Sequence, residues 1–446
     1  MLLLQKFDEI KQYTRLICDQ IRYKKVHDII SEEIENHIID QRDAFIDQGF
    51  DEATATDKAI KEMGDAVIVG SELDRTHRPK PEWSIIFLTI FMLFVGLSVN
   101  FFVGMASASP ELFFQRFAIG MVLGIVCMVV AYFVDFTIIG KYSIALFISL
   151  AIITFIFMIS SRHIHPQIAI IPLTGERTWL YIPVLGSISA NALMLLFPML
   201  YSGIVYTMRN KRYRGIILCG IFYLIPISFG SATISNIFMY TSVCLILLSI
   251  SICKGWFNVN RLYGMLLVFI PVVAVIISQV PALMQSSRFQ VLLDPHIAPM
   301  SAGFNAIVIR DVLNGANFIG QGYFHNDIYT WLFGFNTYSV IVYLVHRLGW
   351  ISAIGIFLIM SILIARGLYL CFKQKSILGQ LVSVSVLLTF TMQILTYMFA
   401  NLGFPLFHHN TLPFISLGKN ALAINLTLVG VMLSVFKTNN LVQKCL

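Results

Sequence analysis

The residues that could do chemistry in this chain are a few charges set between long apolar stretches. From Trp83 onward the sequence contains six acidic residues, and four of them lie in two polar segments: Glu176, Asp294, Asp311 and Asp327. Basic residues accompany them: Arg162, Arg177, Arg288, Arg310, and Lys419 near the start of the last apolar stretch. A carboxylate can act as a general base, and guanidinium and ammonium groups can hold a pyrophosphate. The pattern favours a lipid-linked anionic substrate, although loop charges that are merely solvated remain an alternative.

The elements that position these charges are predicted to be membrane helices. The 446 residues are 57% hydrophobic and 12% charged, with a mean hydropathy of +0.78, which is typical of a polytopic membrane protein. Ten apolar stretches are long enough to span a bilayer: roughly 84–105, 117–138, 142–159, 180–207, 215–231, 233–252, 262–280, 340–365, 378–400 and 414–436. We therefore predict an all-α fold, a bundle of about ten transmembrane helices preceded by a small soluble helical domain.

The charge distribution predicts the topology of this bundle. Residues 1–82 hold 18 of the 24 acidic residues and 12 of the 31 basic ones. The remaining bases cluster at the ends of apolar stretches: RNKRYR (209–214), Lys254 with Arg261, Arg366 with Lys373 and Lys375, and Lys437 with Lys444. Because basic residues favour the cytoplasmic side, both termini are expected there and the segments 160–179 and 281–337 outside. Topology explains the pI near 9.0 better than nucleic-acid binding does, so no nucleic-acid partner is expected.

No metal or disulfide framework is evident in the sequence. The seven cysteines show no CxxC spacing. Two histidine pairs, His163 with His165 and His408 with His409, lack a convergent carboxylate or cysteine. We predict no protein-bound metal from these residues.

The first 82 residues are predicted to form a cytoplasmic helical domain. In the stretch 27–50, isoleucines recur at spacings near 3.6 and give one apolar face. Gly49 is expected to end that helix, Asp51 to cap the next one, and Gly64 to end it. The pattern is similar to the cytoplasmic prefix domains of membrane permeases in Gram-positive bacteria, which implies a role in protein contact.

Three passages of the apolar part resemble one family, the SEDS proteins FtsW, RodA and SpoVE, over roughly residues 84–436. The passage 286–322 resembles the large outer loop of that family, with Arg288, Asp294-Pro295, Gly303-Phe304-Asn305 and Gly320-Gln321-Gly322 in the matching places. The passage 410–426, NTLPFISLGKNALAINL, resembles L-P-F-[IL]-S-Y-G-G-S-S-L, and the passage 173–193 resembles G-[AS]-x-R-W followed by Q-P-S-E. The sequence departs from these motifs at Thr178, at Ser189-Ala190-Asn191 and at Leu417-Gly418-Lys419-Asn420.

The resemblance implies a catalytic aspartate in the motif H-T-D-F before a span that begins near L-G. Matched by composition, His325-Asn326-Asp327-Ile328 takes this place. A second alignment counts back without gaps from Leu348-Gly349-Trp350. It places the motif on Asn336-Thr337-Tyr338-Ser339, with Tyr338 at the position of the aspartate. The sequence leaves both alignments open, and they differ in whether a base is present, because a phenol of ordinary pKa near 10 is a poor base at neutral pH.

The family resemblance implies a divergent peptidoglycan glycosyltransferase in the bacterial plasma membrane that polymerises lipid II or another undecaprenyl-pyrophosphate-linked sugar. Asp327 would be the catalytic base, and Arg177, Arg288, Arg310 and Lys419 would bind the substrate. A divalent cation, Mg²⁺ or Mn²⁺, could assist, and a class B penicillin-binding protein would be the partner. Two alternatives remain: an inactive paralogue that binds precursor or partner proteins, and a transporter of lipid-linked precursors.

The predicted topology can be tested by cysteine labelling in intact cells. A membrane-impermeant thiol reagent should modify a cysteine placed at Ser301, in the predicted outer segment, and should miss one placed at Asn210. The opposite labelling pattern would contradict the topology.

Overall fold

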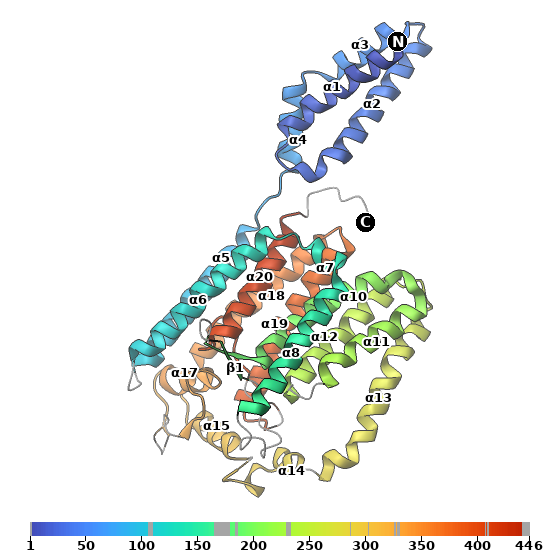
Figure 1. Ribbon diagram of the computed structural model, residues 1–446. Helices are drawn as coiled ribbons and strands as arrows, with labels where there is room; N and C mark the ends of the chain where they lie inside the picture. Colours follow the sequence, from blue (N-terminus) through green and yellow to red (C-terminus); the bar gives the residue numbers. More distant parts are fainter. Residues whose placement is uncertain are drawn as a thin grey trace. The chain divides into compact units, whose positions relative to one another are not determined.

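The computed structural model describes residues 2–105, 110–164, 179–182, 186–228, 233–285, 287–301, 303–324, 327, 331–405, 407 and 410–438. The chain divides into two compact units, one formed by residues 1–81 with 437–446 and the other by residues 82–436 (Figure 1). The cytoplasmic role and protein contacts expected for the first unit stay predictions.

The N-terminal unit is a group of four helices: α1 (Leu2–Gln20), α2 (His27–Asp47), α3 (Glu52–Met63) and α4 (Ala66–His77), with a 3₁₀ turn η1 (Lys24–Val26). The predicted boundary at Asp51 is confirmed, because its carboxylate accepts a hydrogen bond from the amide of Thr54 at 3.2 Å. Gly49 and Gly64 adopt positive φ angles of 94° and 88° after α2 and α3. The predicted apolar face of α2 packs inward through Ile30, Ile34 and Ile38.

The second unit is a bundle of apolar helices, so the chain is a multi-pass membrane protein. Within the described residues, six helical stretches are long and apolar enough to cross a membrane: α5 (Trp83–Met105), residues 114–133 of α6 (Pro110–Phe133), α12 (Ile234–Cys253), α18 (Trp350–Lys373), α19 (Ile377–Asn401) and α20 (Lys419–Phe436). Further helices complete the bundle: α7 (Thr137–Lys141), α8 (Ser143–Ile164), α10 (Phe197–Met208), α11 (Arg212–Ser228) and α13 (Arg261–Gln285). The predicted all-α class is confirmed.

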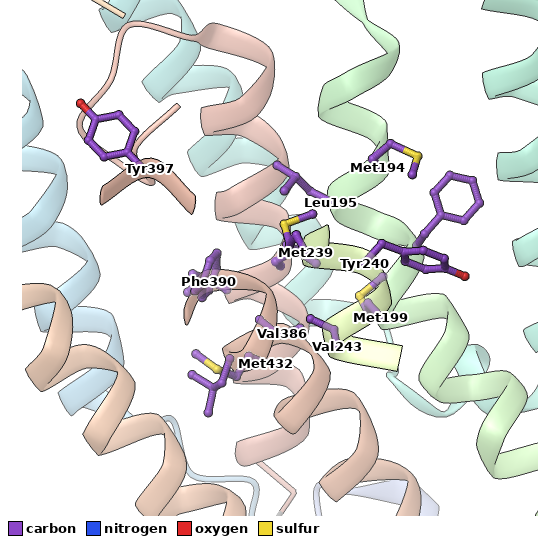
Figure 2. Close-up of a cluster of buried hydrophobic side chains, with 14 of the residues drawn as sticks. Met194, Leu195, Met199, Met239, Tyr240, Val243, Val386, Phe390, Tyr397 and Met432 are labelled. Atoms are coloured by element: carbon purple, nitrogen blue, oxygen red, sulfur yellow. The ribbon is translucent and has the colours of Figure 1, made fainter. Parts of the chain in front are cut away.

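Helices α10 and α19 form the centre of the bundle. Nearly every residue of α10 is buried, which is the pattern of a helix surrounded by protein rather than lipid. Figure 2 shows the core beside it, where Met199 of α10 lies near Met239, Tyr240 and Val243 of α12 and Val386 of α19. Because methionine and aromatic side chains fill irregular gaps, they can join helices of different tilt.

Helices α6 and α20 approach each other closely because glycines face the partner helix. A Cβ at Gly124 of α6 would lie 3.2 Å from the Cα of Ala423 on α20. A Cβ at Gly430 of α20 would overlap the carbonyl oxygen of Met128 on α6. In a membrane, where lipid is as apolar as the side chains, such close backbone packing provides much of the association energy.

One predicted span is wrong in its first half. Residues 180–207 were expected to be helical, but β1 (Trp179–Ile182) and β2 (Gly186–Ser189) pair antiparallel, with Trp179 opposite Ser189. A short helix α9 (Ala190–Leu193) and a 3₁₀ turn η3 (Met194–Leu196) follow before α10 begins. Pro183 and Gly186 interrupt the apolar run, and both residue types disfavour a helix interior.

The predicted span 340–365 is divided at Gly349, and a loop fills the break. Helix α17 (Val340–Leu348) ends there, and α18 begins at Trp350. Gly349 has a φ of 91°, and a Cβ at this position would lie 2.5 Å from the carbonyl oxygen of Phe318. Helix ends leave amide and carbonyl groups without intrahelical partners, and the loop 317–322 supplies them.

Four backbone hydrogen bonds dock that loop into the break. The amides of Gly320 and Gly322 donate to the carbonyls of Leu348 (3.0 Å) and His346 (2.7 Å). The amides of Trp350 and Ile351 donate to the carbonyls of Asn317 (3.1 Å) and Phe318 (3.2 Å). The sequence passage Gly320-Gln321-Gly322 is therefore a docking segment for two helix ends.

The predicted outer segment 281–337 also contains helices: α14 (Ser287–Leu293), the 3₁₀ turn η5 (Pro295–Ile297) and α15 (Phe304–Asn314). The last predicted span, 414–436, begins five residues later than expected, because residues 413–418 form turns and Phe414 has a φ of 65°. Its helix, α20, starts at Lys419.

Close helix packing predicts that Gly430→Ala destabilises the bundle. Its added methyl group meets the backbone of α6, which cannot rotate away, so overpacking should cost about 1–3 kcal/mol. Gly355→Ala on α18 is the matched control, because a Cβ there has no heavy atom within 4 Å and alanine favours the helix. Thermal unfolding of the purified protein in detergent should show a lower midpoint for the first variant alone; equal midpoints would contradict the packing argument.

Candidate functional site

A non-helical segment, residues 410–418, lies inside the helix bundle and forms the centre of the candidate site. Helices surround it and provide hydrogen bonds to its backbone. Asn100 of α5 donates from Nδ2 to the carbonyl of Ile415 at 2.7 Å, and Gln393 of α19 donates from Nε2 to the carbonyl of Thr411 at 3.0 Å. Within the segment, the hydroxyl of Ser416 accepts from the amide of Leu412 at 2.8 Å. Buried backbone groups need such partners, so these side chains fix the course of the segment.

The segment touches α5 directly through backbone. A Cβ at Gly96 would overlap the carbonyl oxygen of Phe414 and would lie 3.0 Å from the ring of Phe117 on α6. The ring of Phe414 in turn packs against Phe390 of α19, with centroids 5.5 Å apart. Residues 410–418 are therefore held between α5 and α19.

The turn that precedes α17 is joined to the same segment. In this turn the amide of Tyr338 donates to the carbonyl of Gly334 at 2.8 Å, and its ring stacks on Phe333 at 6.1 Å. The amide of Leu417 donates to the carbonyl of Asn336 at 3.3 Å. Asn401, at the end of α19, donates from Nδ2 to the carbonyl of Tyr338 at 3.0 Å. These bonds place Tyr338 at the junction of α17, α19 and residues 410–418.

Two of the predicted substrate-binding cations lie on elements that meet this junction. Arg310 of α15 is half-buried and packs on Gly403, just after α19. A Cβ at Gly403 would lie 2.8 Å from the Cγ atom of Arg310 and 3.1 Å from its Nε atom. Lys419 is the first residue of α20, directly after the non-helical segment, and its Cα would be 2.8 Å from a Cβ at Gly120 of α6. The structure therefore brings the elements of Arg310, Lys419 and Tyr338 together around the end of α19.

Asp327 is exposed and lies on the chain between α15 and α17. Its carbonyl oxygen accepts a hydrogen bond from the amide of Trp331 at 3.1 Å. The ring of Trp331 packs on Phe304 at the start of α15, with centroids 5.6 Å apart. Asp327 is thus carried beside α15, the helix of Arg310.

The remaining predicted residues are placed as follows. Arg177 and Glu176 lie outside the described residues, as do His165, His408 and His409. Arg288 belongs to α14, but its side chain is outside the described part. Asp294 accepts from the amide of His296 at 2.9 Å and so begins η5, and Asp311 is exposed on α15. Among the described residues, no group of three or more histidine, cysteine, aspartate or glutamate side chains could hold a metal ion.

Sequence reasoning missed the buried amides that hold the site together. Asn100, Gln393 and Asn401 are each at most 7% exposed. The signal was present, because an amide side chain within an apolar span has to find a polar partner. The side-chain oxygens of Gln393 and Asn401 are also buried without a hydrogen-bond partner in the described residues. They can accept hydrogen bonds from water or from another donor that enters the site.

Comparison with known proteins gives the family. The profile of the FtsW/RodA/SpoVE family, described as cell cycle proteins, matches residues 82–441. The chain belongs to this family. The SEDS resemblance seen in the motifs is therefore confirmed. No match is found among curated protein sequences.

Three solved structures share the fold of this chain. A chain from a peptidoglycan synthase complex, in a study of how polymerization and crosslinking are coordinated, is 17% identical with a TM-score of 0.62, covering 80% of this chain and 98% of its own. The rod shape determining protein RodA of Thermus thermophilus is 13% identical with a TM-score of 0.52, covering 80% of this chain and 96% of its own. A mutant of that protein is 14% identical, with a TM-score of 0.53 and coverages of 80% and 97%.

The junction predicts a local effect of Asn401→Ala. The change removes the hydrogen bonds to the carbonyls of Tyr338 and Tyr397, of which the first joins α19 to the turn before α17. Loss of a buried bond costs about 1–3 kcal/mol, so amides of residues 336–341 should exchange hydrogen roughly 10-fold faster. Ser361→Ala is the matched control, since that hydroxyl bonds only within α18. Unchanged exchange in the turn would show that Asn401 does not hold it.

Proposed function

We propose that the chain is a divergent peptidoglycan glycosyltransferase that polymerises lipid II or another undecaprenyl-pyrophosphate-linked sugar. The supporting observation is the match of residues 82–441 to the family together with the junction that gathers the elements of Arg310 and Lys419. Both side chains are permanent or near-permanent cations, and such groups stabilise a pyrophosphate leaving group. Arg177 and Arg288 are proposed to act on the same anion.

In this reaction the carboxylate of Asp327 is the general base. It accepts the proton of the 4-hydroxyl of the acceptor sugar as that oxygen attacks the anomeric carbon of the lipid-linked donor. The bond from the anomeric carbon to the pyrophosphate oxygen breaks, and undecaprenyl pyrophosphate leaves with the electron pair. Exposure of Asp327 beside α15 is compatible with access to a bulky substrate.

A divalent cation remains part of the proposal, but the residues described here do not form a site for it by themselves. No group of three or more candidate ligands lies together among the described side chains. Pyrophosphate oxygens would have to supply ligands to such a cation. No step is therefore assigned to it.

The partner is proposed to be a class B penicillin-binding protein, which crosslinks the strands. The support is the likeness of fold to a chain from a complex in which polymerization and crosslinking are coordinated. The site is proposed to face the outside of the bacterial plasma membrane and both termini the cytoplasm, as the distribution of basic residues indicates.

A specific observation favours a second function, that of an inactive paralogue that binds precursor or partner proteins. Asn401 joins the turn of Tyr338 to α19, and the bond from the amide of Leu417 to the carbonyl of Asn336 joins the same turn to residues 410–418. If the base of the family belongs at that junction, this chain offers a phenol there in place of a carboxylate, and a phenol of ordinary pKa near 10 is a poor base at neutral pH. Polymerisation would then be slow or absent.

Asp327→Asn decides whether the carboxylate is catalytic. The amide keeps the size of the side chain and removes the base, so polymerisation should fall roughly 10²–10⁴-fold. Asp311→Asn is the matched control, because this exposed acid on α15 has no proposed role. The measurement is glycan strand formation by the purified full chain from labelled lipid II. An Asp327→Asn variant as active as wild type would remove Asp327 from the mechanism.

Tyr338→Asp tests the second function in the same assay. An inactive wild-type protein that gains polymerisation with this change would be a binder whose catalytic position is Tyr338. An active wild type that loses nothing with Asp327→Asn and gains nothing with Tyr338→Asp would contradict both assignments.

A further inference from the structure

The end of α18 that carries Lys373 presents two cations and an exposed ring on one face. Arg366, Tyr369 and Lys373 are spaced by three and four residues, so they lie one above the other along the helix. The ring centroid of Tyr369 is 5.2 Å from the guanidinium carbon of Arg366 and 4.5 Å from the Nζ atom of Lys373. Tyr369 is 48% exposed, so the cations border an open surface.

The start of α5 completes this surface. The Nε atom of Arg366 donates a hydrogen bond to the hydroxyl of Ser84 at 2.9 Å, which fixes the plane of the guanidinium. Two large rings flank the position: Trp83, which is 71% exposed, and Phe372, which is 82% exposed. We call Ser84, Arg366, Tyr369 and Lys373 the α5–α18 headgroup site.

In the part of the chain that the structure describes, the two cations of this site have no carboxylate partner. Neither Arg366 nor Lys373 forms an ion pair with a carboxylate within 4.0 Å there. The remaining N–H groups of both side chains can bind an anion, and a guanidinium with a fixed plane suits a phosphate in two-pronged geometry.

The position along α18 places the site at the surface of a bilayer. A helix of 24 residues is about 36 Å long, whereas the hydrocarbon core of a membrane is about 30 Å thick. Arg366 lies about 10 Å from the Lys373 end of the helix, so its long side chain can reach the level of the phosphates. Trp83 and Tyr369 are residue types that favour this interface.

We propose that the α5–α18 headgroup site binds the phosphate of an anionic phospholipid of the surrounding bilayer. Arg366 and Lys373 hold the phosphate from two sides, and the hydroxyls of Tyr369 and Ser84 bind its oxygens or those of the glycerol. Trp83 and Phe372 contact the apolar part of the same lipid. The proposal commits to a bilayer lipid rather than to soluble phosphate, because exposed aromatic surface beside the cations matches a ligand that is both anionic and apolar.

The site can be tested by native mass spectrometry of the purified, delipidated full chain titrated with phosphatidylglycerol. Each cation at a membrane surface contributes about 5-fold to anionic-lipid binding, so the double variant Arg366→Gln, Lys373→Gln should bind phosphatidylglycerol roughly 25-fold more weakly. Phosphatidylcholine with the same acyl chains should bind wild type more weakly than phosphatidylglycerol does. Tyr369→Phe should have a smaller effect, because it removes only a hydroxyl.

The matched control removes two charges elsewhere. Lys211→Gln with Arg214→Gln takes two exposed cations from the junction between α10 and α11, on the same predicted side of the membrane, and should change binding far less. An equal loss in this control would mean a general surface charge effect and would overturn the site. Equal binding of the two lipids by wild type, or wild-type affinity in the Arg366→Gln, Lys373→Gln variant, would overturn it as well. Displacement of the lipid by soluble glycerol phosphate would identify a phosphate site that does not need the bilayer, against the proposal.

Discussion

The structure of the membrane unit depends on satisfying the backbone of a non-helical segment inside an apolar bundle. A helix meets its own hydrogen-bonding needs, but residues 410–418 cannot, and lipid offers no partners. The amides of Asn100 and Gln393 meet part of this need by binding the carbonyls of Ile415 and Thr411. Because the interactions come from α5 and α19, they also fix how these two helices stand relative to the start of α20.

Glycine makes this arrangement possible at the points where backbones meet. Gly96 allows the carbonyl of Phe414 to reach α5, and Gly120 allows the start of α20 to lie on α6. Gly349 fits the break between α17 and α18, where the loop 317–322 binds both helix ends. The turn of Tyr338 and the segment of Lys419 are thus placed by close backbone contacts together with the buried amide side chains of Asn401, Asn100 and Gln393.

The candidate site holds two cations and offers two positions for a base, Asp327 and Tyr338. Arg310 packs on Gly403 just after α19, and Lys419 begins α20 directly after residues 410–418; these two cations are the proposed pyrophosphate ligands. Asp327 is exposed and lies beside α15, whereas the turn bound to Asn401 carries Tyr338. A protein can keep the fold of its family and the helices that carry its cations while the residue at the position of the general base changes. Fold and catalytic chemistry are separate properties.

The sequence by itself determined the membrane class, most helices of the bundle, the capped helices after Gly49 and the family. Long apolar runs, cap residues and motifs depend on residues that are close together in the sequence, so they can be recognised without the structure. Only the tertiary structure decided that residues 179–182 and 186–189 pair as strands, that Gly349 divides a predicted span, and that Asn401 holds the turn of Tyr338. The break at Gly349 and the bond from Asn401 join backbone groups to partners tens of residues away, and local periodicity carries no information about partners at that distance. The pairing of β1 with β2 is local, but a short apolar run does not distinguish a strand from a helix.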